Sequence, residues 1–269
     1  MTRFEGLARW LNLVDLWTWR HCLVPFLSLF FLMVFLPQFF PTAQANSTTQ
    51  ERGNKKILIV GDSLSAGYGI PQGKGWVSLL QKQIERSHPT LEIVNDSISG
   101  DTTAGGLARL DKALTLINPD WVVIALGGND GLRGQSLKAM SENLTNMIAL
   151  SREHGSGTLL LGMKLPPNYG KQYILQFEKV YEKVAMKTNT PLLPFYIEGV
   201  GGQPGFMQED RIHPNTQAQG FIQKNVWQFM EAYVVESDVA VPDVIVPDVV
   251  VPDVIVPKMT EPLLLPLEK

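Results

Sequence analysis

The feature that most constrains the fold is a regular alternation of short apolar runs and longer amphipathic stretches between residues 55 and 235. The apolar runs are nearly continuous, as expected for strands covered on both faces, and the stretches between them repeat with helical periodicity. This alternation predicts an α/β fold, a three-layer α/β/α sandwich with a five-stranded parallel sheet and right-handed crossovers. The predicted strands are 56–60, 91–95, 121–126, 158–163 and 192–195, and the predicted helices are 76–87, 103–117, 137–154, 173–188 and a last one after Pro214.

Residues 1–45 have the pattern of a secretory signal peptide. Three arginines precede an apolar run over residues 23–36, and Ala43 and Ala45 supply the small residues that signal peptidase favours. The run is short for a membrane-spanning helix, which needs roughly twenty residues. We therefore expect cleavage after Ala45, a polar linker over residues 46–54, and a periplasmic or secreted protein. An uncleaved N-terminal anchor is the alternative.

The C-terminal segment, residues 236–269, differs in character from the rest of the chain. A five-residue unit, Asp-Val-x-Val-Pro, occurs four times between Asp238 and Pro257. Proline at every fifth position prevents a helix and removes the hydrogen-bond donors that a sheet interior needs. The repeat predicts a flexible, extended tail of polyproline-II type, with a strand that docks onto a partner as the alternative.

Composition excludes several classes of protein. The chain has 269 residues and a formal net charge of −3, and it lacks the basic stripe expected of a nucleic-acid-binding protein. Cys22 is its only cysteine, so one chain can build neither a disulfide framework nor a thiolate metal site. The sequence also has no His/Asp/Glu cluster with metal-ligand spacing and no Walker-type loop. We therefore expect no metal, no cofactor and no nucleic-acid partner.

Residues suited to chemistry follow the predicted strands, where parallel sheets place their active sites. Ser63 lies in a Gly-Asp-Ser sequence directly after the first strand, at a turn into a helix where backbone N–H groups are unpaired. This placement makes Ser63 a candidate nucleophile. Ser65 is the alternative nucleophile, although it is farther from the strand end. Taken alone, Gly-Asp-Ser is more often a simple turn or a helix cap.

Two further motifs could supply donors to an oxyanion. Gly100 lies in the loop after the second strand, where its N–H is free to point at a developing negative charge. Asn129 follows two glycines after the third strand and carries a neutral amide donor. Each motif also has an ordinary interpretation, since Asp101 or Thr102 could cap a helix and Gly-Gly-Asn is often a turn.

A base and its orienting carboxylate are found before the last helix. A serine hydroxyl needs a base, and the base needs a carboxylate, which Asp210 and His213 can supply if the chain turns between them. Pro214 is a natural first residue of the following helix. Among the other histidines, His21 belongs to the signal peptide, while His88 and His154 fall at predicted helix ends. His213 is therefore the best available base.

Together these motifs resemble the SGNH/GDSL hydrolase family, and within it the bacterial periplasmic thioesterase I/lysophospholipase type, often labelled arylesterase. Ser63, Gly100, Asn129 and His213 match the four signature positions, and the resemblance extends over about residues 55–233. It implies a flavodoxin-like fold and hydrolysis of acyl esters and thioesters by a Ser63–His213–Asp210 triad. It also implies an oxyanion hole built from Ser63, Gly100 and Asn129. Further matching stretches are 105–110, 127–134, 165–170 and 191–195.

The resemblance extends to substrate contacts and leaves alternatives open. The loop over residues 165–170 is implied to shape an acyl groove, and the residues expected to contact the substrate are Asp62, Leu64, Asn168 and Tyr169. Asp96 departs from the family, which usually has a small residue there. We interpret it as facing a solvated turn, the alternative being a charge near the site.

Two other functions remain to be weighed. One is a carbohydrate O-acetylesterase on the same fold, and the other is a non-catalytic envelope binding protein that docks partners through its repeat tail. We expect a monomer whose partner is a small acyl ester or thioester. Contact with a membrane would occur only through the substrate or an uncleaved anchor.

Overall fold

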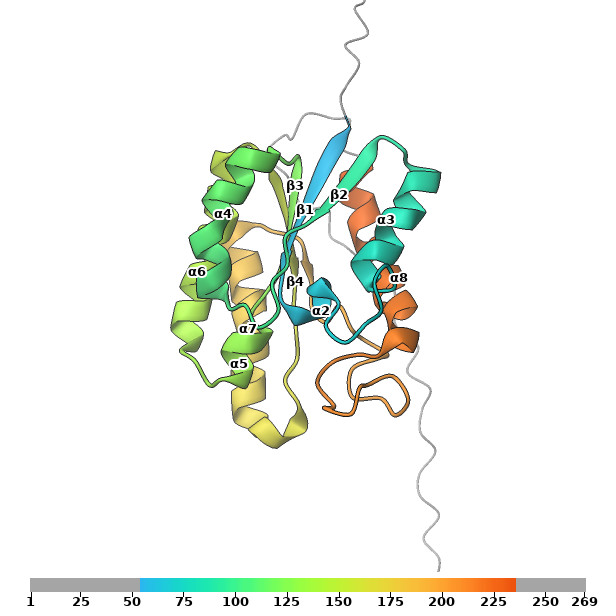
Figure 1. Ribbon diagram of the computed structural model, residues 1–269. Helices are drawn as coiled ribbons and strands as arrows, with labels where there is room; N and C mark the ends of the chain where they lie inside the picture. The colour runs from blue at the N-terminus through green and yellow to red at the C-terminus, as the bar shows by residue number, and fades with distance from the viewer. Residues whose placement is uncertain (1–53, 236–269) are drawn as a thin grey trace, which may run out of the picture. The chain divides into compact units, whose positions relative to one another are not determined.

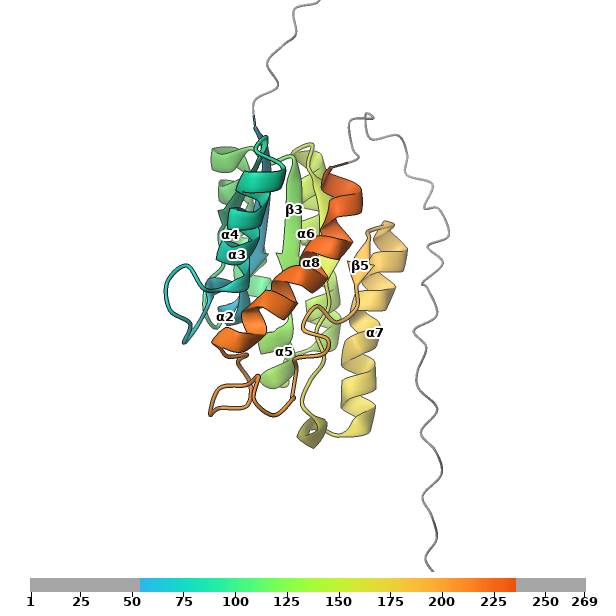
Figure 2. The same ribbon diagram turned by 90° about the vertical axis from the view of Figure 1, so that its right-hand side faces the viewer.

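A five-stranded parallel sheet forms the centre of the computed structural model, which describes residues 54–235. The strand order is β2-β1-β3-β4-β5, and every neighbouring pair is parallel. Strands β1 to β4 are labelled in Figure 1, and β5 is labelled in Figure 2. This arrangement confirms the predicted α/β fold with a five-stranded parallel sheet. The strands are β1 (Lys55–Gly61), β2 (Leu91–Asn95), β3 (Trp121–Ala125), β4 (Gly157–Leu161) and β5 (Leu192–Leu193).

Helices cover both faces of this sheet. On one face, α4 packs against α6, and α6 packs against α7. On the other face, α3 packs against α8, and Figure 2 shows these two helices in front of the sheet. The two short helices α2 and α5 lie at the carboxyl end of the sheet. The helices are α2 (Ser63–Ala66), α3 (Trp76–Ser87), α4 (Thr103–Ile117), α5 (Gly128–Leu132), α6 (Leu137–Glu153), α7 (Lys171–Thr188) and α8 (Gln219–Val234), with one-turn 3₁₀ helices η1 (Pro167–Tyr169) and η2 (Thr216–Ala218).

The central strands owe their position to burial on both faces. Four consecutive residues of β1 have no exposed surface at all, although neighbouring side chains of a strand point to opposite faces. A strand with one wet face would alternate buried and exposed residues, so β1 must be covered by helices on each side. The four residues are Ile57, Leu58, Ile59 and Val60.

Most predicted boundaries agree with the structure, and the differences have local causes. The strand predicted over 192–195 contains only Leu192 and Leu193, because prolines lie on either side of it and cannot donate to the ladder. The prediction that Pro214 begins the last helix is wrong. The Asn215 side chain instead accepts hydrogen bonds from the N–H groups of Gln217 and Ala218, so η2 precedes α8.

The predicted signal peptide and the repeat tail lie outside the described residues, as does most of the predicted linker. Within residues 54–235, none of the helices combines the length and the hydropathy that crossing a bilayer would require.

The core on the α4 side can be tested with two leucines of the same helix. Leu110 is fully buried, whereas 72% of Leu116 is exposed. We expect Leu110→Ala to lower the free energy of unfolding by about 2–5 kcal/mol, because it leaves a cavity against the sheet. Leu116→Ala should change it by about 0.5 kcal/mol or less. Urea unfolding of both variants measures the difference, and equal effects would contradict this packing.

Candidate active site

The register of the sheet brings three loops to one place. Gly61, the last residue of β1, pairs with Ala125, the last residue of β3, and Ile59 pairs with Asn95 at the end of β2. The segments that follow these three strands therefore start side by side at the carboxyl edge. These segments carry Ser63, Gly100 and Asn129.

Ser63 is the first residue of α2. The Asp62 side chain caps this helix by accepting a hydrogen bond from the N–H of Leu64 at 3.0 Å. Ser63 is half-buried and shares a small depression with Leu64, Tyr68 and His213. Ser63 therefore lies at the carboxyl edge of the sheet and is partly exposed.

His213 connects this hydroxyl to a carboxylate. Its Nε2 lies 2.8 Å from the Oγ of Ser63, and its Nδ1 lies 2.6 Å from the Oδ2 of Asp210. A carboxylate can only accept, so the hydrogen in the second contact resides on Nδ1 and leaves Nε2 free to accept the Ser63 proton. The three side chains thus form a chain of two hydrogen bonds across 150 positions of sequence.

A tight turn gives Asp210 its position. Arg211 adopts a left-handed backbone with φ of 57°, and the Oδ1 of Asp210 accepts hydrogen bonds from the N–H groups of Ile212 and His213. Partial desolvation acts to raise the pKa of Asp210, but the hydrogen bonds from His213 and Ile212 outweigh it and lower the pKa. Asp210 is therefore held as the anion that an imidazolium needs beside it.

Two residues that the sequence did not identify support the imidazole. The ring of Tyr68 lies against that of His213 with centroids 4.6 Å apart. The Gln208 side-chain amide donates to the carbonyl groups of Tyr68 and Pro214 at 2.9 and 3.1 Å, and so ties the two segments together. Tyr68 ends the stretch Gly-Asp-Ser-Leu-Ser-Ala-Gly-Tyr that contains Ser63, and its closeness to Ser63 in sequence could have signalled it. Gln208 carries no such signal.

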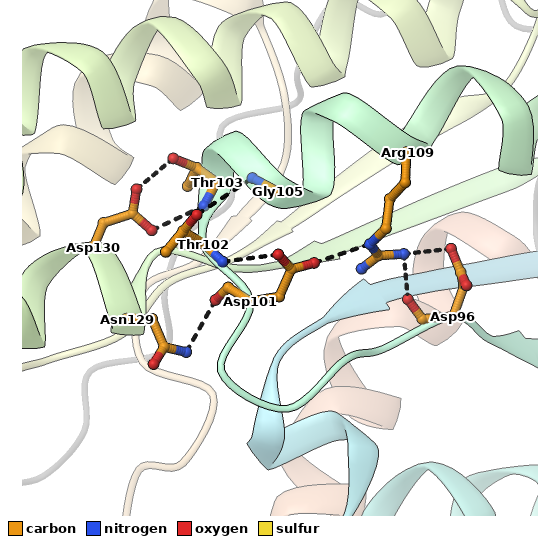
Figure 3. A network of polar contacts seen from close by, with 8 residues as sticks. All are labelled: Asp96, Asp101, Thr102, Thr103, Gly105, Arg109, Asn129 and Asp130. Atoms are coloured by element: carbon orange, nitrogen blue, oxygen red, sulfur yellow. Dashed lines mark hydrogen bonds and ion pairs between the residues drawn. The ribbon is translucent and has the colours of Figure 1, made fainter.

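The loop after β2 is ordered around Gly100, whose φ of 80° favours glycine. The Asn129 amide donates from Nδ2 to the carbonyl of Asp101 at 3.0 Å, as Figure 3 shows, and makes a longer contact of 3.5 Å with the Oδ2 of Asp62. Next to it, the Asp130 carboxylate accepts from the N–H and the hydroxyl of Thr103. Helix α5 therefore holds this loop from one side.

Arg109 holds the same loop from the other side. Its guanidinium pairs with Asp101 at 2.9 Å and also with Asp96, whose backbone carbonyl it contacts as well. The interpretation of Asp96 as a residue that simply faces solvent is therefore wrong, because its carboxylate is engaged by Arg109. A charge at this position fixes the start of the loop to helix α4.

The other predicted residues divide into enclosed and exposed ones. Asp62 is only 3% exposed, so its carboxylate contacts protein rather than a substrate, contrary to expectation. Ser65, the alternative nucleophile, is equally buried. Asn168 is exposed, while the hydroxyl of Tyr169 donates to the carbonyl of Leu132 at 3.0 Å and ties this loop to α5.

The loop over residues 164–167 and the start of α7 enclose an open groove of about 350 Å³. Apolar and charged side chains line it together. The lining residues are Lys164, Leu165, Pro167, Lys171, Ile174, Leu175 and Glu178.

The other two histidines of the described region lie at helix ends, as the sequence predicted. His88 follows α3 and contacts the ring of Trp227, and His154 follows α6 and pairs with Asp111 at 3.0 Å. Over residues 54–235 no three His, Cys, Asp or Glu side chains come together as a metal-binding group.

Burial of Asp62 has an electrostatic consequence. Desolvation raises the pKa of this carboxyl to about 6, against the opposing effects of the Leu64 N–H and of His213. A carboxyl whose pKa is higher in the folded protein than in the unfolded chain stabilises the fold while it is protonated. That contribution is complete below the unfolded pKa, near pH 4, and is lost as the pH rises through about 6.

We expect this loss to disappear in Asp62→Asn, which keeps an oxygen to cap α2 but cannot ionise. Between pH 4 and pH 7, the wild-type chain should lose on the order of 2–3 kcal/mol of unfolding free energy relative to the variant. Urea unfolding at several pH values measures the difference between the two proteins. A difference that does not vary with pH would contradict a buried, titrating Asp62.

Comparisons with known proteins identify the family of this chain. The sequence pattern of the GDSL-like Lipase/Acylhydrolase family matches residues 59–220, more than half of the chain. The chain is 50% identical over 179 residues to esterase TesA of Pseudomonas aeruginosa, covering 66% of this chain and 89% of that protein. It is 43% identical over 166 residues to thioesterase 1/protease 1/lysophospholipase L1 of Escherichia coli, covering 62% and 78% respectively.

A solved structure gives the same result at the level of the fold. The crystal structure of TesA superposes with a TM-score of 0.65 at 49% sequence identity, covering 66% of this chain and 99% of that one. Sequence and structure thus agree over the region that carries Ser63, Gly100, Asn129 and His213. The chain belongs to the GDSL-like lipase/acylhydrolase, or SGNH hydrolase, family.

Proposed function

We propose that this chain hydrolyses acyl esters and thioesters through a covalent acyl-enzyme on Ser63. The observation that carries the proposal is the position of His213, whose two ring nitrogens contact the Ser63 hydroxyl and the Asp210 carboxylate at 2.8 and 2.6 Å. In this proposal Ser63 is the nucleophile, His213 the general base and Asp210 the group that orients it.

The first half of the reaction transfers the acyl group. His213 accepts the Ser63 proton on Nε2 while the serine oxygen attacks the acyl carbonyl, and the carbonyl oxygen becomes an oxyanion. The carbon–oxygen or carbon–sulfur bond to the leaving group then breaks, and His213 returns its proton to the departing alcohol or thiol. Asp210 remains an anion throughout and stabilises the imidazolium.

The second half regenerates the enzyme. His213 removes a proton from water, the resulting hydroxide attacks the acyl carbon, and the bond to Ser63 breaks as the serine oxygen regains the proton. The products are a carboxylic acid and free enzyme.

The oxyanion is assigned to three neutral donors: the N–H groups of Ser63 and Gly100 and the side-chain amide of Asn129. Neutral donors suit this task because they stabilise negative charge without protonating the base. The Nδ2 of Asn129 donates one of its two hydrogens to the Asp101 carbonyl. Its other hydrogen makes only the 3.5 Å contact with Asp62, which is weak enough to be exchanged for an oxyanion.

The substrate class follows from the relatives and from the groove. Proteins similar to this chain are named esterase and thioesterase/lysophospholipase, which supports a substrate with an acyl group joined to oxygen or sulfur. The groove is lined by the apolar side chains of Leu165, Ile174 and Leu175, which supports binding of a medium or long acyl chain. Asn168 and Tyr169 follow the groove residue Pro167 in sequence, and Leu64 lines the depression at Ser63, so we propose all three as substrate contacts.

The proposed setting is the periplasm or the exterior of the cell, with a monomeric enzyme. This part rests on the sequence pattern of residues 1–45 as a signal peptide. The hydrolase domain would then occupy residues 55–235, between a linker over 46–54 and the repeat tail over 236–269.

Covalent labelling tests the nucleophile. A fluorophosphonate probe should label the wild-type protein, and Ser63→Ala should abolish labelling because, among residues 54–235, no other hydroxyl is hydrogen-bonded to His213. Ser65→Ala is the matched control and should retain labelling, since Ser65 is buried. Unlabelled wild-type protein would instead favour the non-catalytic binding protein, whose partners a pull-down with and without the repeat tail would identify.

Chain length separates the proposal from a carbohydrate O-acetylesterase. With p-nitrophenyl esters from acetyl to palmitoyl, we expect kcat/KM to rise beyond acetyl, because each added methylene buried in an apolar groove contributes about 0.8 kcal/mol at most. A maximum at acetyl would contradict the acyl groove and favour the acetylesterase.

A further inference from the structure

Arg133, directly after α5, contacts two of the three segments that carry proposed oxyanion donors. Its Nη2 donates to the carbonyl of Gly100 at 2.9 Å and approaches the Oδ1 of Asn129 at 3.4 Å. An added Cβ on Gly100 would meet the same nitrogen at 3.4 Å, so the guanidinium lies directly over this residue. Over residues 54–235, no acidic side chain forms an ion pair with Arg133.

The Asn129 amide can face the site in two ways, and only one of them is productive. With Nδ2 toward the Asp101 carbonyl and the substrate, it can donate to an oxyanion. Rotated by half a turn, it would present its own oxygen to the oxyanion and to the Asp101 carbonyl. Its NH₂ group would then point at a guanidinium, which can only donate.

The contact with Arg133 therefore favours the same orientation as the bond to the Asp101 carbonyl. In the observed orientation a cation faces the amide oxygen, and in the rotated one a cation faces the amide hydrogens. The 2.9 Å bond to the Gly100 carbonyl also fixes the loop. It does so at a glycine with a positive φ, a residue type whose backbone is otherwise free to adopt many conformations.

We infer that Arg133 is a positioning residue of the oxyanion hole, which holds the Asn129 amide and the Gly100 loop with their donors directed at the substrate. This inference rests on the proposed function. Arg133 acts through the two donors and need not touch the substrate itself, so its effect should fall on the transition state rather than on substrate binding.

The test uses Arg133→Met and a short, uncharged p-nitrophenyl ester, so that attraction of a charged substrate plays no part. If the productive orientation falls to about one tenth of the molecules, kcat falls about tenfold while KM changes by about twofold or less. Arg152→Met is the matched control. Arg152 is also exposed and also donates to loop carbonyls, those of Thr188 and Asn189, and its loss should leave kcat unchanged.

A double-mutant cycle asks whether Arg133 acts through Asn129. Asn129→Ala alone should lower kcat by about 10²–10³. Adding Arg133→Met to that variant should cost clearly less than tenfold, because the amide is already gone and only the bond to the Gly100 carbonyl is left to lose. A full tenfold cost in both backgrounds would overturn the action through Asn129, and an unchanged kcat or an effect confined to KM would overturn the inference as a whole.

The proposed function can fail separately. If the wild-type protein neither hydrolyses the ester nor reacts with the fluorophosphonate probe at Ser63, the proposed function is wrong. If the wild-type protein is active and Arg133→Met matches Arg152→Met in kcat, only the role of Arg133 is wrong. Thermal unfolding of each variant identifies any loss of kcat that comes from a destabilised fold.

Discussion

The parallel pairing of β1 with β2 on one side and β3 on the other is the constraint on which the rest of the site depends. In a parallel ladder all carboxyl ends point the same way, so three loops that are far apart in sequence begin next to one another. The register places the ends of β1 and β3 opposite each other. A shift of one residue would turn the buried side chains toward the wrong faces, so the packing of the core also fixes where Ser63, Gly100 and Asn129 start.

Around this edge, several side chains bind the backbone of neighbouring segments. Asp130 binds the start of α4, Arg109 spans Asp96 and Asp101, and Asn129 binds the Asp101 carbonyl, so the loop after β2 is held at several points. Donors that are fixed before the reaction need no reorganisation when charge develops, which is the main source of electrostatic catalysis in such sites. The buried Asp62 carboxyl lowers the stability of the fold when it is ionised, because burial removes water from the charge.

Much of the fold could be read from the chain. The apolar runs predicted all five strands, and the bounds of α3 and α4 agree with the prediction. The misses have physical reasons. The short helices α2 and α5 contain too few residues to show a periodicity, and α5 begins at two glycines, which ordinarily disfavour a helix. The prediction placed the start of the last helix at Pro214, whereas the Asn215 side chain caps the helical turn η2 one residue later.

The sequence by itself determined the class of fold and the identity of the residues suited to chemistry, because both depend on local patterns and on residue types at strand ends. Only the tertiary structure decided how these residues are supported. Four contacts join positions that are distant in sequence or lie on separate elements. They are the Tyr68 ring on His213, the Gln208 amide between two segments, the Asp96–Arg109 pair and the guanidinium of Arg133 over Gly100. Contacts of this kind depend on the packing of helices against the sheet, and no periodicity or spacing in a single sequence encodes them.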